Sequence, residues 1–281
     1  ITCDQIKTIN YLSYFFLTFC FINILLIPFS HFYFSSFRFM GVFANPNGLA
    51  MAICGILPFV VYSKHEGLIQ IQKTYFYLFI GIIFIMMILT ASRTSLISLL
   101  MFIILVFKSR VKILLIFLVL LFFFFYYLDL INFNFINDIE FILNVIRFDT
   151  ISTASGRLDI WSVAFKEILK NPIFGNGFTY DVNFIQNYGI SNFGINYPRE
   201  YGGIWNSYLS LLLNAGILGL LSYLFFLFKM WQLSINKRFA TAILLMFCLI
   251  GFSESWMMSS LNILFPLMII NWSLLQQKLI K

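Results

Sequence analysis

The sequence predicts an all-α fold, a polytopic bundle of about eight transmembrane helices with one large extracytoplasmic loop. Of the 281 residues, 61% are hydrophobic, 20% are aromatic and only 10% are charged, whereas an ordinary soluble domain carries about 25% charged residues. A water-soluble fold of this length could not bury so much apolar surface. Soluble enzymes, nucleic-acid-binding proteins and disordered proteins are therefore excluded.

The predicted spans follow from the apolar runs, because a transmembrane helix needs about 20 mainly apolar residues. We expect spans at residues 10–30, 43–62, 74–92, 94–107, 113–128, 205–228, 239–253 and 255–277. The fourth and fifth are short, and the basic run 108–112 separates them. Its long side chains are expected to reach the membrane interface.

The basic residues predict the orientation. With the N-terminus in the cytoplasm, every second short loop is basic, and the short outer turns hold only Arg38 and Arg93. The net charge of +7 is thus a topology signal. Segment 129–204 then lies outside the cytoplasm and is too long to be a mere connection. We treat residues 1–281 as a single integral membrane domain; the chain begins with Ile1, which leaves open whether further spans precede it.

The four cysteines show no paired spacing, and three of them lie within apolar runs. Neither a disulfide framework nor a zinc site is predicted from them.

Three arginines outside the cytoplasm stand near predicted helix starts. Arg38 precedes the Asn-Pro-Asn stretch 45–47, which is typical of an N-cap followed by proline at the first helical position. Arg93 lies at the start of the fourth span, with Ser92 as the expected cap. Arg157 opens a predicted amphipathic helix within the large loop.

That loop helix is expected to run from Arg157 to about Lys170, where the following Asn-Pro pair ends it. Its expected apolar face consists of Leu158, Trp161, Phe165 and Ile168, and its polar side of Lys166, Glu167 and Lys170.

Arginine is preferred over lysine where a phosphate must be gripped by a planar fork, and helix N-termini attract phosphates. The three arginines therefore predict a phosphorylated ligand at the outer membrane surface. The alternative is that each arginine anchors an interface or pairs with a nearby acid, as Arg157 could with Asp159.

Four stretches of the chain resemble the O-antigen ligase and O-antigen polymerase superfamily. They are Arg38–Gly48, Thr90–Ser95, Ser155–Gly177 and Trp205–Gly219. Their order, their spacing and the long outer loop also look like those of the family. Each stretch alone is weak, but four in order on a matching topology are specific for the superfamily.

The resemblance implies a glycosyltransferase of the bacterial cytoplasmic (inner) membrane with its active site facing the periplasm. Its donor would be a glycan on an undecaprenyl pyrophosphate carrier, with no nucleotide sugar, metal or other cofactor. By position, Arg38, Arg93 and Arg157 would bind the pyrophosphate, and Arg157 would also be catalytic by stabilising the leaving group. The expected partners are membrane lipid, the carrier-linked glycan and its acceptor, with a chain-length regulator as a further candidate; no nucleic acid is expected.

One position departs from the family. Many members begin the span after the large loop with His-Asn, and that histidine is the favoured group to activate the acceptor hydroxyl; here the pair reads Trp205-Asn206. Tryptophan cannot take a proton, so another residue serves as base or none is needed. Glu200 is our candidate, with a solvated loop acid as its alternative reading. Trp205 and Asn206 are candidates for glycan binding, although Trp205 also suits an interfacial belt.

These patterns favour a polymerase of carrier-linked oligosaccharide repeat units, for O-antigen or a similar surface polysaccharide, because loss of the histidine suits a substrate-specific enzyme. The alternative in the same class is a ligase that passes the glycan to lipid A-core. A permease or a non-catalytic envelope scaffold are alternatives of other classes. Repeat symmetry and charged helices, which favour a permease, are missing apart from Glu254, for which we favour a short outer turn between the last two spans.

Overall fold

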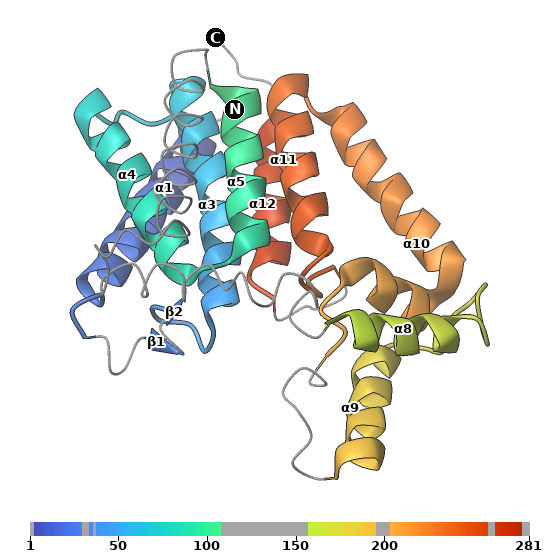
Figure 1. Cartoon of the computed structure of the whole chain (residues 1–281). Helices are drawn as coiled ribbons and strands as arrows, with labels where there is room; N and C mark the ends of the chain where they lie inside the picture. The colour runs from blue at the N-terminus through green and yellow to red at the C-terminus, as the bar shows by residue number, and fades with distance from the viewer. Residues whose placement is uncertain are drawn as a thin grey trace, which may run out of the picture. The chain divides into compact units, whose positions relative to one another are not determined.

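The computed structural model describes residues 3–29, 34–35, 38–107, 157–194, 203–257 and 262–276, which are mainly α-helical (Figure 1). The predicted fifth span, 113–128, and residues 129–156 and 195–202 of the predicted large loop lie outside the described residues. The chain divides into two compact units.

The first unit is a helical bundle with a buried central helix. It contains α1 (Cys3–Leu25), α3 (Pro46–His65), α4 (Lys73–Thr90), α5 (Arg93–Val106), α11 (Lys237–Gly251) as far as Met246, and α12 (Leu264–Gln276) from Pro266 onward. Helix α3 contacts α1, α4 and α5, and nearly all of its residues are buried.

Helix α12 approaches α3 closely at a glycine. A Cβ atom on Gly55 would lie 2.6 Å from the Cβ of Leu267, so no larger residue fits without a shift. Asn271 donates a hydrogen bond of 2.8 Å to the Gly55 carbonyl. An amide hydrogen bond of this kind joins helices where the surroundings offer no water.

The starts of α3 and α5 follow the sequence prediction. Asn45 is the N-cap of α3, its side chain accepts from the Gly48 N–H at 2.7 Å, and proline opens the helix. Ser92 precedes Arg93 at the start of α5, as predicted, but its side chain makes no capping hydrogen bond. The Ser92 hydroxyl instead donates to the Ser95 hydroxyl at 3.0 Å.

A short antiparallel pair, which the sequence did not predict, precedes α3. Strand β1 (Phe34–Ser35) pairs with β2 (Arg38–Phe39), with Phe34 opposite Phe39 and Ser35 opposite Arg38. The ring of Phe39 is fully buried. Burial of this ring anchors β2 and fixes the backbone that carries Arg38.

The second unit contains α8 (Arg157–Ile168), α9 (Tyr180–Phe193), α10 (Ser207–Leu233) and the chain from Phe247 to Phe265. Its core consists of Ile160, Ala164, Ile168, Ile185, Ile204 and Leu213. Trp161 packs against this core and donates a hydrogen bond of 2.9 Å from its ring nitrogen to the Ile204 carbonyl. The backbone just before α10 is thereby fixed to α8.

The predicted apolar face of α8 is partly wrong. Leu158 and Phe165 are about half exposed, whereas Ile160, Ala164 and Glu167 are buried together with Ile168. The pattern was ambiguous because α8 has apolar residues on more than one side. Ala164 is small, so the core residues of this unit can approach α8 closely on that side. Glu167 can be buried there because Lys170 and Tyr180 both bond to its carboxylate.

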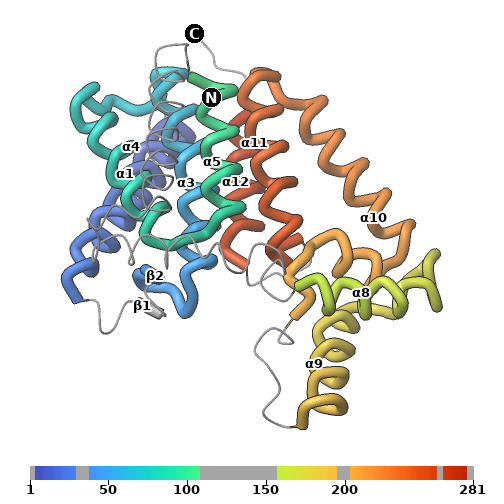
Figure 2. Tube along the Cα trace, in the orientation of Figure 1, coloured from blue at the N-terminus to red at the C-terminus, as the bar shows by residue number. Residues whose placement is uncertain are grey.

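Helix α10 is broken at Gly216, whose φ of 63° and ψ of −166° are not helical. Figure 2 shows the tube of α10 changing direction. Segment 172–177 fills the break with backbone hydrogen bonds on both sides. They run from Asn176 N–H to Leu213 O (2.8 Å), Gly177 N–H to Asn214 O (2.9 Å), Ile217 N–H to Pro172 O (2.8 Å) and Leu218 N–H to Ile173 O (3.3 Å).

Seven of the eight predicted spans overlap helices, namely α1, α3, α4, α5, α10, α11 and α12, but α1 begins and ends earlier than the predicted span 10–30, and α12 begins at Leu264 where the sequence predicted residue 255. In the described part of the chain, α1, α3, α4 and α10 are long and apolar enough to cross a membrane, and α5 and α12 are apolar but shorter. A mainly helical protein with four helices long and apolar enough to cross a membrane is confirmed for the described residues, whereas the number of eight spans stays a prediction.

Candidate functional site

Arg38 joins two of the family-like stretches within the first unit. Its Nε donates to the Thr90 carbonyl at 2.9 Å, and its Nη2 donates to the Asn47 side-chain oxygen at 2.6 Å. Thr90 is the last residue of α4, where carbonyl groups lack helical partners and attract cations. The stretch 38–48 and the stretch 90–95, separate in sequence, therefore meet at this guanidinium.

Arg93 is the first residue of α5 and is half-buried. The chain turns sharply before it, because Ala91 takes the left-handed conformation with φ of 51° at the end of α4. The stretch 90–95 is thus a tight helix-to-helix turn with an arginine at the new N-terminus. Such an N-terminus favours negatively charged ligands.

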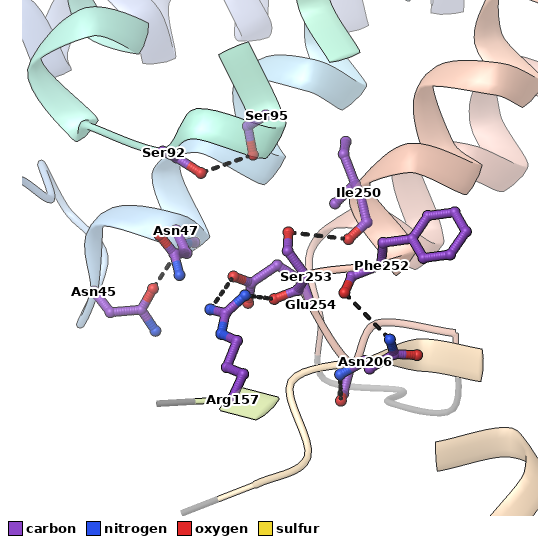
Figure 3. A network of polar contacts seen from close by, with 12 residues as sticks. Asn45, Asn47, Ser92, Ser95, Arg157, Asn206, Ile250, Phe252, Ser253 and Glu254 are labelled. Atoms are coloured by element: carbon purple, nitrogen blue, oxygen red, sulfur yellow. Dashed lines mark hydrogen bonds and ion pairs between the residues drawn. The ribbon is translucent and has the colours of Figure 1, made fainter. Parts of the chain in front are cut away.

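Arg157 is the first residue of α8, and its guanidinium is held from two directions (Figure 3). Nη1 donates to the Ser253 carbonyl at 2.6 Å, and Nη2 lies 3.4 Å from Glu254 Oε1. The Arg157 side chain is 20% exposed and that of Glu254 is 7% exposed. A largely buried ion pair of this kind costs desolvation energy on both sides and holds its partners in one place.

The start of α10 organises the turn that carries Glu254. Asn206 accepts from the N–H groups of Tyr208 and Leu209, each at 3.0 Å, and so caps α10, while it also donates to the Phe252 carbonyl at 3.3 Å. The fully buried Ser207 donates to the Glu254 carbonyl at 2.6 Å. The turn 252–257 is therefore bound directly to the first residues of α10.

A family comparison assigns these stretches. A sequence model described as O-antigen ligase matches residues 78–224. The chain belongs to the O-antigen ligase family. The match includes Arg93 and Arg157 and ends within α10, and the resemblance inferred from the sequence is thereby confirmed. Neither a search of curated proteins nor a search of solved structures found a match.

Within this O-antigen ligase family chain, the second unit brings together stretches that the sequence could only align in order. The segment 171–177 lies against the Asn-Ala-Gly stretch 214–216. A Cβ on Gly175 would lie 2.5 Å from the Ala215 nitrogen. The two glycines, Gly175 and Gly216, are therefore required by close backbone approach, and the pairing explains why both stretches occur together.

Trp205 precedes α10 at the position compared above with a histidine of the family. Its φ of 53° lies in the left-handed region, which is uncommon for a bulky side chain and costs of order 1–3 kcal/mol. The neighbouring Ile204 and Asn206 are buried, whereas Trp205 is half-buried. Assignment of Trp205 and Asn206 to glycan binding stays a prediction, and Glu200 lies outside the described residues.

The sequence did not predict that Glu254 is buried or that it pairs with Arg157. The favoured turn between the last two spans is present, since residues 252–257 follow the end of α11. Glu254 is, however, 5% exposed and paired with Arg157, where the sequence suggested Asp159 as the nearby acid. An acidic residue flanked by two serines between long apolar runs was the available signal.

A second charged cluster lies along α8, away from its first residue. Lys170 lies 2.6 Å from one carboxylate oxygen of Glu167, and the Tyr180 hydroxyl donates to the other at 2.9 Å. Burial raises the pKa of Glu167, but the hydrogen bonds from Lys170 and Tyr180 outweigh it and hold the pKa below its usual range. Burial and the bond to Glu167 raise the pKa of Tyr180. This cluster joins α8 to α9.

Proposed function

We propose that this protein is a polymerase of undecaprenyl-pyrophosphate-linked oligosaccharide repeat units, working at the outer face of the bacterial cytoplasmic membrane. Family membership supports an O-antigen ligase- or polymerase-type enzyme acting on lipid-linked glycans. The substitution of Trp205 for the family histidine favours the polymerase, because it suits a substrate-specific enzyme.

The observation that carries the proposal is the fixed guanidinium of Arg157 at the start of α8. A guanidinium has five N–H donors, and Arg157 donates to Ser253 and Glu254. Two contacts hold the group in place and leave donors for a phosphate. Because it is held before the ligand arrives, little reorganisation is needed when negative charge develops on the leaving group.

In the proposed reaction the acceptor hydroxyl oxygen bonds to the anomeric carbon of the donor glycan. The bond from that carbon to the phosphate oxygen breaks, and the electron pair leaves with the carrier pyrophosphate. Arg157, with Arg38 and Arg93 as further pyrophosphate-binding residues, stabilises the leaving charge. Glu200 stays the acid predicted from sequence to take the acceptor proton, and Trp205 the residue predicted to stack on a sugar.

The proposal is tested in a bacterial strain that lacks this gene and carries plasmid-borne variants. Glycan gels of the deletion strain should show single repeats capped on lipid A-core, and the intact chain should restore long glycans. Arg157→Lys should not restore them, because lysine keeps the charge but loses the planar fork. This variant is preferable to alanine, which would leave Glu254 buried without its ion-pair partner at a cost of about 3–5 kcal/mol.

Lys166→Gln is the matched control, because Lys166 is an exposed basic residue of the same helix. It should give normal glycans. Long glycans in the Arg157→Lys strain, with the protein present in the membrane, would refute the assignment. A complete lack of capped glycan in the deletion strain, with carrier-linked polymer accumulating, would instead identify a ligase.

A further inference from the structure

Glu254 is a buried carboxylate in a place where the fold alone does not require one. It lies in the turn 252–257 that follows α11, and only 5% of the residue is exposed. Burial of a carboxylate costs several kcal/mol unless it is paired. The pair with Arg157 offsets that cost but does not explain it, since an apolar residue in the turn would avoid it. A buried acidic residue beside a candidate ligand-binding arginine is therefore a candidate for a role in the reaction.

The turn that carries Glu254 is also bound to the start of α10, directly after Trp205. Ser207, two residues after Trp205, donates its hydroxyl to the Glu254 carbonyl at 2.6 Å. The Asn206 N–H donates to the Ser255 hydroxyl at 3.0 Å, and the Ser210 hydroxyl donates to the same oxygen at 3.2 Å. The carboxylate is therefore carried by a turn that several hydrogen bonds fix to the start of α10.

The reaction needs one proton acceptor and no proton donor. The acceptor hydroxyl must lose its proton as its oxygen attacks, whereas a pyrophosphate leaves as an anion without protonation. Carboxylates serve as the base where an attack on an anomeric carbon inverts the configuration. Arg157 Nη2 lies 3.4 Å from Glu254 Oε1 and so holds the carboxylate beside the candidate pyrophosphate-binding guanidinium.

We propose that Glu254, in place of the Glu200 predicted from the sequence, is the proton acceptor of this enzyme. The inference rests on the proposed glycosyl transfer. As the acceptor oxygen bonds to the anomeric carbon, its proton moves to a Glu254 oxygen, and the carbon–oxygen bond to the pyrophosphate breaks. Glu254 then releases the proton to water as the product leaves. Arg157 acts on both sides of the step, holding the base and the leaving group.

The test uses the full chain in lipid nanodiscs with carrier-linked repeat units extracted from the deletion strain. Glu254→Gln should lower the rate of elongation by about 10²–10⁴-fold, the usual range for loss of a general base. Retention of the carrier-linked donor on the nanodiscs should stay within about threefold of the intact chain, because the amide can still bond to Arg157. Glu167→Gln is the matched control, a buried acid of the same unit outside the site, and should keep its elongation rate.

Rescue by small anions separates a base from a mere anchor for Arg157. In Glu254→Ala, added carboxylates should restore elongation, with acetate more effective than formate and formate more effective than chloroacetate, following their basicity. An anchor predicts rescue that does not depend on basicity. Full activity of Glu254→Gln, rescue independent of basicity, or absence of rescue in a variant with an unchanged melting temperature would each overturn the proposal.

The two proposals fail in different ways. If the intact chain transfers glycan to lipid A-core but does not elongate it, the polymerase assignment fails. The rescue of Glu254→Ala by added carboxylates is then measured on the transfer of glycan to lipid A-core. Its dependence on basicity still decides whether Glu254 takes the proton. If Glu200→Gln is inactive while Glu254→Gln elongates normally, the base is Glu200, and the assignment to Glu254 is refuted.

Discussion

The break in α10 gives a sharp test of how the second unit is built. Gly216 has φ of 63° and ψ of −166°, a conformation that is almost reserved for glycine. A Cβ atom at this position would lie 2.2 Å from the Ile173 carbonyl oxygen and 2.7 Å from the Gly175 nitrogen. Both neighbours are backbone atoms, so Gly216→Ala must push segment 172–177 away from α10.

The magnitude follows from the contacts that would be lost. Backbone strain at such a conformation costs about 1–3 kcal/mol for a non-glycine residue. The Ile217 and Leu218 N–H groups would each lose a hydrogen bond to segment 172–177, worth about 0.5–1.5 kcal/mol apiece. Gly216→Ala should therefore lower the free energy of unfolding by about 2–6 kcal/mol.

The assay is thermal unfolding of the purified full chain in detergent, together with limited proteolysis. Each kcal/mol should lower the melting temperature by roughly 2–4 °C, and cleavage should increase between α8 and α9. Two control variants separate the contribution of backbone strain from that of the steric clash. Gly177→Ala carries strain without a clash, since its φ is 103° and nothing lies within 4 Å, whereas Gly203→Ala meets only ordinary contacts with the Trp205 ring at 3.7 Å or more.

The expected order of destabilisation is Gly216→Ala, then Gly177→Ala, then Gly203→Ala close to the intact chain. If Gly216→Ala melted with the intact protein, the backbone pairing across the break would contribute nothing, and our account of this unit would be refuted. If Gly177→Ala matched Gly216→Ala, strain alone would explain the effect and the close approach to Ile173 would be irrelevant.

Two further predictions concern other contacts. Tyr180→Phe removes a hydrogen bond that lowers the pKa of Glu167, so unfolding should become easier by roughly 1–2 kcal/mol at neutral pH. Because the pKa of Glu167 is lower in the folded chain, its ionised form stabilises the fold at pH values above the unfolded pKa of about 4.3, and this stabilisation is lost as the pH falls. If Tyr180→Phe lowered the free energy of unfolding equally at pH 7 and at pH 3 in urea titrations, this explanation would be contradicted. Arg38→Lys should cost about 1–2 kcal/mol, because one ammonium group cannot reproduce the fork that joins Thr90 and Asn47; an unchanged melting temperature would contradict it.

The helices, and the starts of α3, α5 and α8, were predictable from the sequence because local chemistry decides them. Asn45 and the following proline begin α3 as expected, and Arg93 and Arg157 open α5 and α8. Continuous apolar runs long enough for a membrane predicted most of the remaining helices. These features depend on neighbours within one turn, so they are readable without knowledge of the fold.

Long-range pairings were not predictable in the same way. The partner of Arg157 is Glu254, 97 residues away, and no local pattern relates the two. The buried side of α8 was misjudged because it depends on which of its several apolar strips meets α9 and α10. The break in α10 was hidden as well, since a glycine in an apolar run reads equally well as a helix-packing residue.

Segment 172–177 determines the angle between the two halves of α10. It is bonded to the carbonyls of Leu213 and Asn214 on one half of α10 and to the N–H groups of Ile217 and Leu218 on the other, so the angle between the halves is set by a segment outside the helix. That segment leads directly from α8, whose opening residue is Arg157. Insertion or deletion of one residue between α8 and Gly175 would therefore change the direction of the part of α10 that follows Gly216, although the sequence of α10 stays the same.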